Sequence, residues 1–371
     1  MKIKEIIEFL QQMSPLAYAE DFDNVGLLVG NQNQETSGIL VCHDALETVV
    51  DEAISKKCNL IVCFHPILFS GIKKITGNNY VERSIIKAIK NDISIFAIHT
   101  ALDNHQEGVN KIFCNALGLI NTKVLIPKLN FIQKLVTYTT TENANKLRNS
   151  LFEAGAGKIG NYENCSFNSV GNSTFQGNEN SNPVVGSRLE LVESEEIKIE
   201  VTFEKHLQNQ ILKVLFSNHV YEEVAYEIYN LENQHQNIGL GMIGELEIET
   251  SEKEFLEFVK LKMQAQCIKH SEFLNKKINK VAVLGGSGSL AIKQAIAAGA
   301  DVFLTADLKY HNFYEAENQI LLADIGHFES ERFTKNYIYD YLTKKITNFA
   351  NSNLINKIYL SNVNTNPVKY L

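Results

Sequence analysis

The chain of 371 residues contains no tryptophan and no long basic run, and its formal net charge is −8 at pH 7. Proteins that bind nucleic acids broadly gather Lys and Arg on one face, so this composition argues against that class. No apolar stretch approaches the roughly 18 residues of a membrane span, and we therefore expect no membrane association. The remaining composition, 44% hydrophobic and 21% charged, is typical of globular proteins.

The cysteines show neither a C-x-x-C pair nor the dense spacing of disulfide-rich secreted domains. The N-terminal segment MKIKEIIEFLQQM has the spacing of an amphipathic helix, and it lacks the apolar core and cleavage site of a signal peptide. We therefore expect a cytoplasmic protein with reduced, mostly buried thiols. The six cysteines are Cys42, Cys58, Cys63, Cys114, Cys165 and Cys267.

The first third of the chain alternates short apolar runs with segments of helical periodicity. Strands are expected at residues 38–44, 58–64 and 93–100, because each is a short apolar run followed or preceded by a helical segment. This alternation predicts βαβ units with parallel pairing, in which ligands bind at the carboxyl ends of the strands. His65 and the segment HTALDNH both fall just past such an end.

The last third repeats this style, whereas the middle reads as β-α-β-β-α-β, the split ferredoxin-like order. The fold class that we predict is therefore α/β, with two α/β halves forming one domain that an α+β insert interrupts. The first half is expected at residues 1–128, the insert at 129–243 and the second half at 244–371. Ser251 and Glu254 have the spacing of a capping box at the start of a helix in the second half.

Four places along the outer halves carry residues that could bind a metal. His65 and Asp103 follow strands of the first half, and Asp307 follows a strand of the second half. His327 and Glu331 are spaced i, i+4, which places both side chains on one face of a helix. Such a set suits a divalent ion such as zinc, iron or manganese, and a bridging carboxylate could join two ions roughly 3.5–4 Å apart.

Each of these features also has a purely structural interpretation. His65 before Pro66 could be an ordinary residue at a strand end, and Asp103 could cap a helix. His327 and Glu331 could form a solvated pair on an exposed helix. The GGSGS stretch after a strand resembles a phosphate-binding turn, but it matches neither a dinucleotide-binding motif nor a P-loop.

Six stretches, taken together and in this order, resemble one known family across nearly the whole chain. They are PLAYAEDFDNVGLLVGN, FHPILFSGIKKI, HTALDNHQEGVN, VAVLGGSGS, ADLKYH and GHFESERF. The family is that of the GTP cyclohydrolase 1 type 2 homologs, also called NGG-one-interacting factor three-like proteins, which bind a dinuclear metal centre. The middle segment looks like the insert of its longer bacterial members, which is similar to the PII and CutA folds.

The resemblance implies metal ligands at His65, Asp103, His327 and Glu331. Many bacterial members have two adjacent ligand histidines before the proline, and here the first of these positions is Phe64, which cannot coordinate. We therefore expect one tight metal and a second that is weak or absent, with zinc the foremost candidate. A fifth ligand could come from His99, His105 or His311, whereas nothing in the sequence connects His43 with the site.

The same resemblance implies a hydrolase that uses metal-activated water on GTP or a related small molecule. In that case His105 or His311 would serve as general acid/base, and Asp307 and His99 would contact the substrate. The alternative is a non-catalytic metal-binding protein with a regulatory or metal-trafficking role. The resemblance also implies a homohexameric ring, and although a ring could accommodate nucleic acid, the net charge disfavours that partner.

Overall fold

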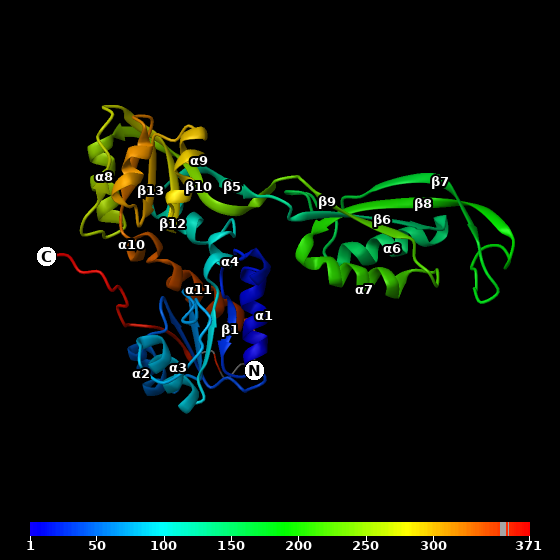
Figure 1. Cartoon of the computed structure of the whole chain (residues 1–371), viewed down its shortest axis with the longest axis horizontal. Helices are drawn as coiled ribbons and strands as arrows, with labels where there is room; N and C mark the ends of the chain where they lie inside the picture. Colours follow the sequence, from blue (N-terminus) through cyan, green and yellow to red (C-terminus); the bar gives the residue numbers. More distant parts are fainter. Residues whose placement is uncertain (349–353, 355) are drawn as a thin grey trace. The chain divides into compact units, whose positions relative to one another are not determined.

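The structure is a computed structural model that describes residues 1–348, 354 and 356–371. Its chain forms two compact units (Figure 1). Unit 1 contains Met1–Ile126 together with Asn237–Leu371, and unit 2 contains Pro127–Gln236. Within the described ranges, no helix combines the length and the apolar character needed to cross a membrane.

The first sheet of unit 1 has the strand order β1-β4-β3-β2-β15. All neighbouring pairs are parallel except β1 with β4. Every residue of the three central strands is buried, because helices cover both faces, and this is why these strands are continuous apolar runs. The strands are β1 (Gly26–Val29), β2 (Ile39–Cys42), β3 (Leu60–Cys63), β4 (Ser94–Ala97) and β15 (Ile358–Leu360).

The helices around this sheet are amphipathic. α2 (Glu47–Ser55) and α3 (Tyr80–Lys90) pack on it from one side, and α11 (Thr334–Thr347) packs on β2 and β15. α1 (Ile3–Met13) contacts α11 and buries Ile3, Ile6 and Leu10, which confirms the amphipathic N-terminal helix predicted from the sequence.

The second sheet of unit 1 has the order β11-β14-β13-β12-β10-β5. Its three central strands are parallel, and β10 and β11 flank them in antiparallel orientation. Along β12, Val281 and Val283 join one buried cluster while Ala282 and Leu284 join another, so both faces of the sheet are covered. The strands are β5 (Ile120–Lys128), β10 (His235–Ser251), β11 (Lys269–His270), β12 (Lys277–Ser287), β13 (Val302–Ala306) and β14 (Leu321–Asp324).

Short helices complete unit 1. α5 (Val109–Ala116) and α8 (Glu252–Lys262) contribute to one buried cluster, and α9 (Ile292–Ala297) contributes to the other. α8 begins with the capping box predicted from Ser251 and Glu254. The remaining helices are α4 (His99–Asp103), α10 (His327–Glu331), η1 (Leu16–Tyr18), η3 (Ser289–Ala291) and η4 (Tyr310–Ala316).

Unit 2 is a four-stranded antiparallel sheet with the order β7-β8-β6-β9, packed on two helices. The chain order is β-α-β-β-α-β, the order that the term ferredoxin-like denotes. The elements are β6 (Ile132–Thr139), α6 (Thr141–Glu153), β7 (Phe167–Gln176), β8 (Leu191–Glu204), η2 (Lys205–Leu207), α7 (Gln208–Asn218) and β9 (Tyr226–Leu231). Its core is its own, built around side chains such as Leu147, Ile199 and Ile211.

Candidate metal centre

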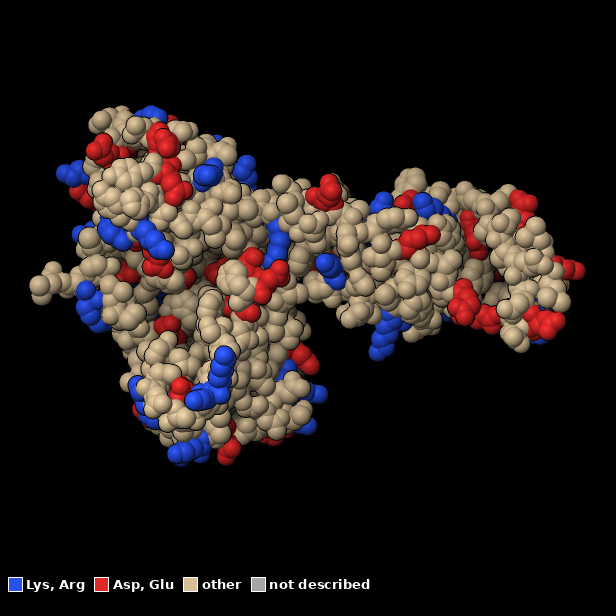
Figure 2. Space-filling model, viewed as in Figure 1, with Lys and Arg blue, Asp and Glu red and all other residues tan. Residues whose placement is uncertain are grey.

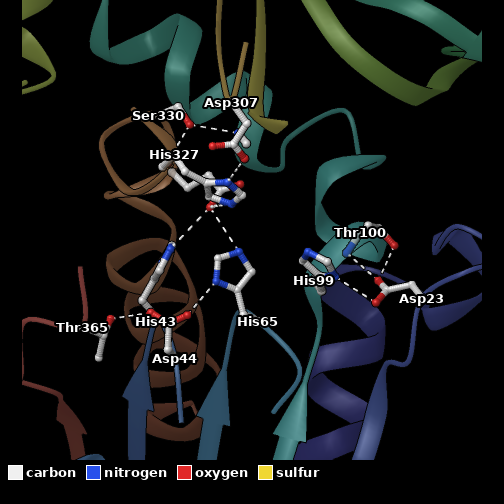
Figure 3. Close-up of polar contacts among 12 residues, drawn as sticks. Asp23, His43, Asp44, His65, His99, Thr100, Asp307, His327, Ser330 and Thr365 are labelled. Atoms are coloured by element: carbon white, nitrogen blue, oxygen red, sulfur yellow. Dashed lines mark hydrogen bonds and ion pairs between the residues drawn. The ribbon is translucent and has the colours of Figure 1, made fainter. Parts of the chain in front are cut away.

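Polar side chains of unit 1 gather where parallel strands of both sheets end. His43 and Asp44 directly follow β2, and His65 follows β3 after one residue. From the second sheet, Asp307 directly follows β13, and His327 opens α10 shortly after β14. Carboxyl ends of parallel strands are the usual place for ligands in α/β folds. Figure 3 shows the rings of His43, His65 and His327 pointing toward one another from the two sheets.

One carboxylate oxygen lies at the middle of this cluster. The Oε2 atom of Glu331 is 3.4 Å from His43 Nε2, 3.3 Å from His65 Nε2 and 3.4 Å from His327 Nε2. Donor atoms that lie 2.0–2.1 Å from a tetrahedral ion are about 3.3–3.4 Å from one another. The ligand atoms of His65, His327 and Glu331 also lie within 4.8 Å of one another. The spacing therefore fits a cation shared by His65, His327 and Glu331, whereas the ligand atom of His43 is grouped with those of Asp44 and His65.

Several buried polar atoms at this place make no hydrogen bond within the described chain. They are both ring nitrogens of His43, Oδ1 of Asp103 and Oε2 of Glu331. Burying such atoms without partners is costly, and most buried polar atoms in proteins are satisfied. Imidazole nitrogens and carboxylate oxygens are common ligands of zinc and related ions. The donor set thus fits a divalent metal, which would satisfy Oε2 of Glu331 and one ring nitrogen of His43.

Two further carboxylates fix the orientation of two imidazoles. His65 donates from Nδ1 to Asp44 Oδ1 at 2.8 Å, and His327 donates from Nδ1 to Asp307 Oδ2 at 2.7 Å. Asp44 is itself held by the hydroxyl of Thr365. These contacts leave the Nε2 atoms to act as ligands, an arrangement found around most metal-binding histidines.

The electrostatics of the cluster are those of a site that attracts positive charge. Burial opposes the charged form of His65, but Glu331 and Asp44 outweigh it and raise its pKa to about 10. Burial likewise opposes protonation of His327, yet Asp307 and Glu331 raise its pKa to about 11. Burial, together with the charge of Glu331, raises the pKa of Asp103 well above its usual value. A nearby cation would favour the charged form of Asp103.

The cluster opens into a cavity of about 960 Å³ whose walls include Asp44, His65, Asp103, His327 and Glu331. None of the described residues that line it is Lys or Arg. Its wider lining is largely apolar and aromatic, with Phe22, Ile67, Phe69, Tyr80, Leu290 and Pro367. A ligand would therefore meet acidic and imidazole groups at one end and apolar surface elsewhere.

The glycines of the GGSGS stretch give the cluster its space. Gly286 has a φ of +68°, and a Cβ atom there would lie 2.5 Å from Glu331 Oε1 and 3.4 Å from His327 Nε2. Its backbone N–H donates to Ser330 Oγ at 2.9 Å, which joins β12 to α10. Any side chain at this position would displace the carboxylate, so close backbone approach is the evident reason for glycine here.

His99 forms a second polar group on the cavity wall. Its Nδ1 atom is 2.9 Å from Asp23 Oδ1, and Asp23 also accepts hydrogen bonds from Thr100 (Figure 3). The backbone φ of His99 is +30°, and that of Asp307 is +55°. Non-glycine residues seldom adopt such angles, and they cluster at functional sites where the surroundings enforce them.

The structure separates the residues singled out in the sequence into two sets. His65, Asp103, His327, Glu331 and His99 all line the cavity. Asp307 does not line the cavity but accepts a hydrogen bond from Nδ1 of His327. Glu331 is only 3% exposed, so it is not part of a solvated pair, and α5 takes Gly108, not Asp103, as its N-cap.

The two histidines considered as general acid/base lie elsewhere. His105 stacks on Tyr18 with ring centroids 6.1 Å apart, and His311 is exposed beside Tyr310 and Tyr314. Neither is among the described residues that line the cavity. Their distance along the chain from the ligand motifs is short, but the backbone directs them to other surroundings.

Sequence reasoning noted His43 without connecting it with the site, and it missed Asp44 and Asp23. His43 follows the apolar run ILVC in the same way that His65 follows LIVC, one residue later. That parallel was the available signal, because β2 and β3 are adjacent and their ends meet at one edge.

The fold and the cluster define an α/β protein with a candidate divalent-metal centre. Comparison with known families places residues 1–367 in the Duf34/NIF3 (NGG1p interacting factor 3) family, and the chain belongs to it. A Bacillus subtilis relative named GTP cyclohydrolase 1 type 2 homolog is 36% identical, covering 99% of this chain and 98% of that protein. A Staphylococcus epidermidis relative of the same name is 34% identical over the full length of both chains.

Solved structures agree with this assignment. A Bacillus cereus protein related to NIF3 has a TM-score of 0.86 and 36% identity, covering 100% of this chain and 99% of that one. Reduced HcgD from Methanocaldococcus jannaschii has a TM-score of 0.54 at 21% identity, covering 98% of both chains. The second similarity concerns the fold alone.

Proposed function

We propose that the protein is a metal-dependent hydrolase of a small molecule with a planar, nucleobase-like part. The observation that carries this proposal is the convergence of three imidazole Nε2 atoms on Glu331 Oε2, with His65, His327 and Glu331 lining an open cavity. When bound there, a divalent ion, with zinc the foremost candidate and iron or manganese as alternatives, supplies Lewis acidity toward water and a substrate oxygen.

The residues of the chain then have distinct tasks. Asp44 and Asp307 hold the rings of His65 and His327 with Nε2 directed at Glu331. Asp23 holds His99 by Nδ1, which leaves Nε2 as the ring atom that can take up or release a proton. A His–Asp pair of this kind is a common general acid/base. His99 is therefore the proton-transfer residue in this proposal, in place of His105 and His311.

The cavity wall supports a planar and weakly charged substrate. Phe22 is 67% exposed and Phe69 is 52% exposed, and their ring centroids lie 6.4 Å apart at the cavity. Exposed aromatic rings stack readily on bases, each contact contributing about 1–3 kcal/mol. A triphosphate, by contrast, would meet no Lys or Arg among the described lining residues. A nucleobase, nucleoside or similar heterocycle is thus favoured over GTP itself.

The charge on the visible surface is compatible with a small-molecule function. In Figure 2, the Lys and Arg side chains of the face shown are scattered singly or in small groups between acidic ones, within each unit. Recognition of nucleic acid relies on a continuous basic surface, which this face does not present.

A second candidate function is metal binding without catalysis, in regulation or trafficking. The observation in its favour is the 38% exposure of His327, which gives solvent access to one imidazole of the cluster. An exposed ligand is a route for metal exchange with a partner. Turnover separates the two candidates, because only the first requires it.

The test uses purified full-length protein. Metal content is measured by elemental mass spectrometry, and the same preparation is screened for hydrolysis of nucleobases, nucleosides, nucleotides and phosphoesters. We expect bound metal and metal-dependent turnover of a heterocyclic substrate, which His99→Asn abolishes while metal stays bound. Bound metal without turnover in a broad screen would favour the non-catalytic candidate, and absence of metal after reconstitution would overturn both.

We also propose a homo-oligomer, with the hexamer as the expected state. Its support is the edge strand β7 of unit 2, where Phe167 is 67% exposed and Val170 is 64% exposed. Edge strands with exposed apolar side chains are usually covered by another chain. A monomeric mass by light scattering at micromolar concentration would contradict this proposal.

A further inference from the structure

His43 is the most unusual imidazole in the cluster. It is 3% exposed, and neither ring nitrogen makes a hydrogen bond in the described part of the chain. Aromatic rings surround it, with centroids 5.4 Å away at Phe64 and 5.2 Å away at Phe328. Its Nε2 lies 3.4 Å from Glu331 Oε2, and its ligand atom also lies within 4.8 Å of those of Asp44 and His65.

Other partly buried histidines of this chain are satisfied differently. His219 has its Nε2 3.0 Å from the carbonyl of Tyr138, and His99 is paired with Asp23. An imidazole that is buried without such a partner loses its hydrogen bonds to water and gains none from the protein, which is rare in native structures. A histidine with a structural role in the core would therefore have a partner, and among the described residues His43 has none that forms a hydrogen bond.

We propose that His43 is itself a ligand of the metal, supplied from β2 to the site that Glu331 centres. Its Nε2 approaches Glu331 Oε2 at the same distance as the Nε2 atoms of His65 and His327. This inference rests on the proposed metal site and adds an imidazole that neither the family motifs nor the sequence analysis assigns.

The position of Phe64 explains why the chain needs this residue. Phe64 is fully buried directly before His65, and its ring lies against that of His43. A phenyl ring supplies no lone pair to a divalent ion, so the expected imidazole is missing at position 64. His43, at the end of the neighbouring strand β2, supplies an imidazole in place of the one missing after β3.

The experiment compares metal binding by four forms of the full-length protein. They are the wild type, His43→Leu, the double variant His43→Leu with Phe64→His, and His270→Ala. His270 is the control because it is exposed on β11 and stacks on Phe273. Each form is stripped with a chelator and titrated with Zn²⁺ and Co²⁺ in competition with a chromophoric chelator, and the visible spectrum of the Co²⁺ form is recorded.

Removing a residue that merely orients a ligand weakens metal binding about 10- to 100-fold, so loss of a ligand should weaken it at least tenfold. We expect His43→Leu to show this loss with an altered Co²⁺ spectrum, the double variant to regain a substantial part, and His270→Ala to match the wild type. Equal affinity and an unchanged spectrum in His43→Leu would overturn the inference.

Two further outcomes are distinguishable. If the wild type itself binds no metal, the proposed function fails together with this inference; if it binds metal and His43→Leu binds equally, only the role of His43 fails. Should His43→Leu not fold, as judged by circular dichroism in chelator, His43→Asn replaces it under the same criteria.

Discussion

Replacing Glu331 by Gln removes one negative charge from the centre of the cluster while it keeps the size of the side chain. The carboxylate is 3% exposed, and its Oε2 is the atom that three imidazoles approach. Burial alone would raise its pKa, but His65 and His327 hold that pKa well below its usual value, so the wild-type side chain is an anion. A neutral amide is a far weaker ligand for a divalent ion.

The magnitude follows from binding linkage. Metal present at about 1,000 times its dissociation constant stabilises the native state by about 4.1 kcal/mol. If the substitution weakens binding about 100-fold, the same metal concentration stabilises it by only about 1.4 kcal/mol. For a folded unit of this size, 1 kcal/mol corresponds to about 2–4 °C in melting temperature, so the metal-induced shift should shrink by roughly 5–11 °C.

The assay is thermal unfolding of wild type and variant, each in chelator and in excess Zn²⁺, together with bound metal by elemental mass spectrometry. Glu329→Gln is the matched control, because Glu329 is a buried carboxylate of the same helix whose Oε1 accepts from Asn366 at 3.0 Å. The comparison within each variant removes any general loss of stability. A Glu331→Gln protein with wild-type metal content and an undiminished shift would refute this reasoning.

Three other perturbations have definite expected outcomes. Asp44→Asn removes the carboxylate that orients His65, and should weaken metal binding about 10- to 100-fold in the same titration without abolishing it. Glu82 accepts hydrogen bonds from the backbone N–H groups of Thr76 and Asn78, and these contacts lower its pKa to about 2. The charged carboxylate therefore stabilises the fold above about pH 4.5, and this stabilisation is lost as the pH falls toward 2. Glu82→Gln should accordingly flatten the decline of melting temperature between these pH values. Deletion of residues 127–236 with a short Gly/Ser bridge should leave metal content unchanged, since the cluster lies wholly in unit 1; a folded deletion protein without metal would contradict this.

Much of the fold could be predicted because apolar runs and helical periodicity are local properties of the sequence. The strands around Val41 and Val62 are runs of four buried residues, and the capping box at Ser251 lies within one turn. The placement of His65 past a strand end followed from the same reasoning. These signals need no knowledge of which segments meet in space.

The remaining part of the cluster depends on long-range packing. The sequence shows that His43 follows its strand much as His65 does, but its link to the site needed the finding that Glu331 Oε2 lies 3.4 Å from its Nε2. Conversely, His105 is two residues from Asp103 in the chain, yet the end of α4 turns it toward Tyr18. Proximity in sequence therefore suggests a site role for His105 that the structure does not support, and gives no hint of the role of His43.

The cluster draws its side chains from opposite ends of the polypeptide, and this fixes when it can form during synthesis. His43 and His65 leave the ribosome before His327 and Glu331, which are made more than 250 residues later. At about 5–20 residues per second, translation from His65 to Glu331 takes on the order of 10 to 60 seconds. Until then the nascent chain holds only half of the donors, so loading with metal belongs to the finished protein. A chain that terminates before His327 is left without a centre.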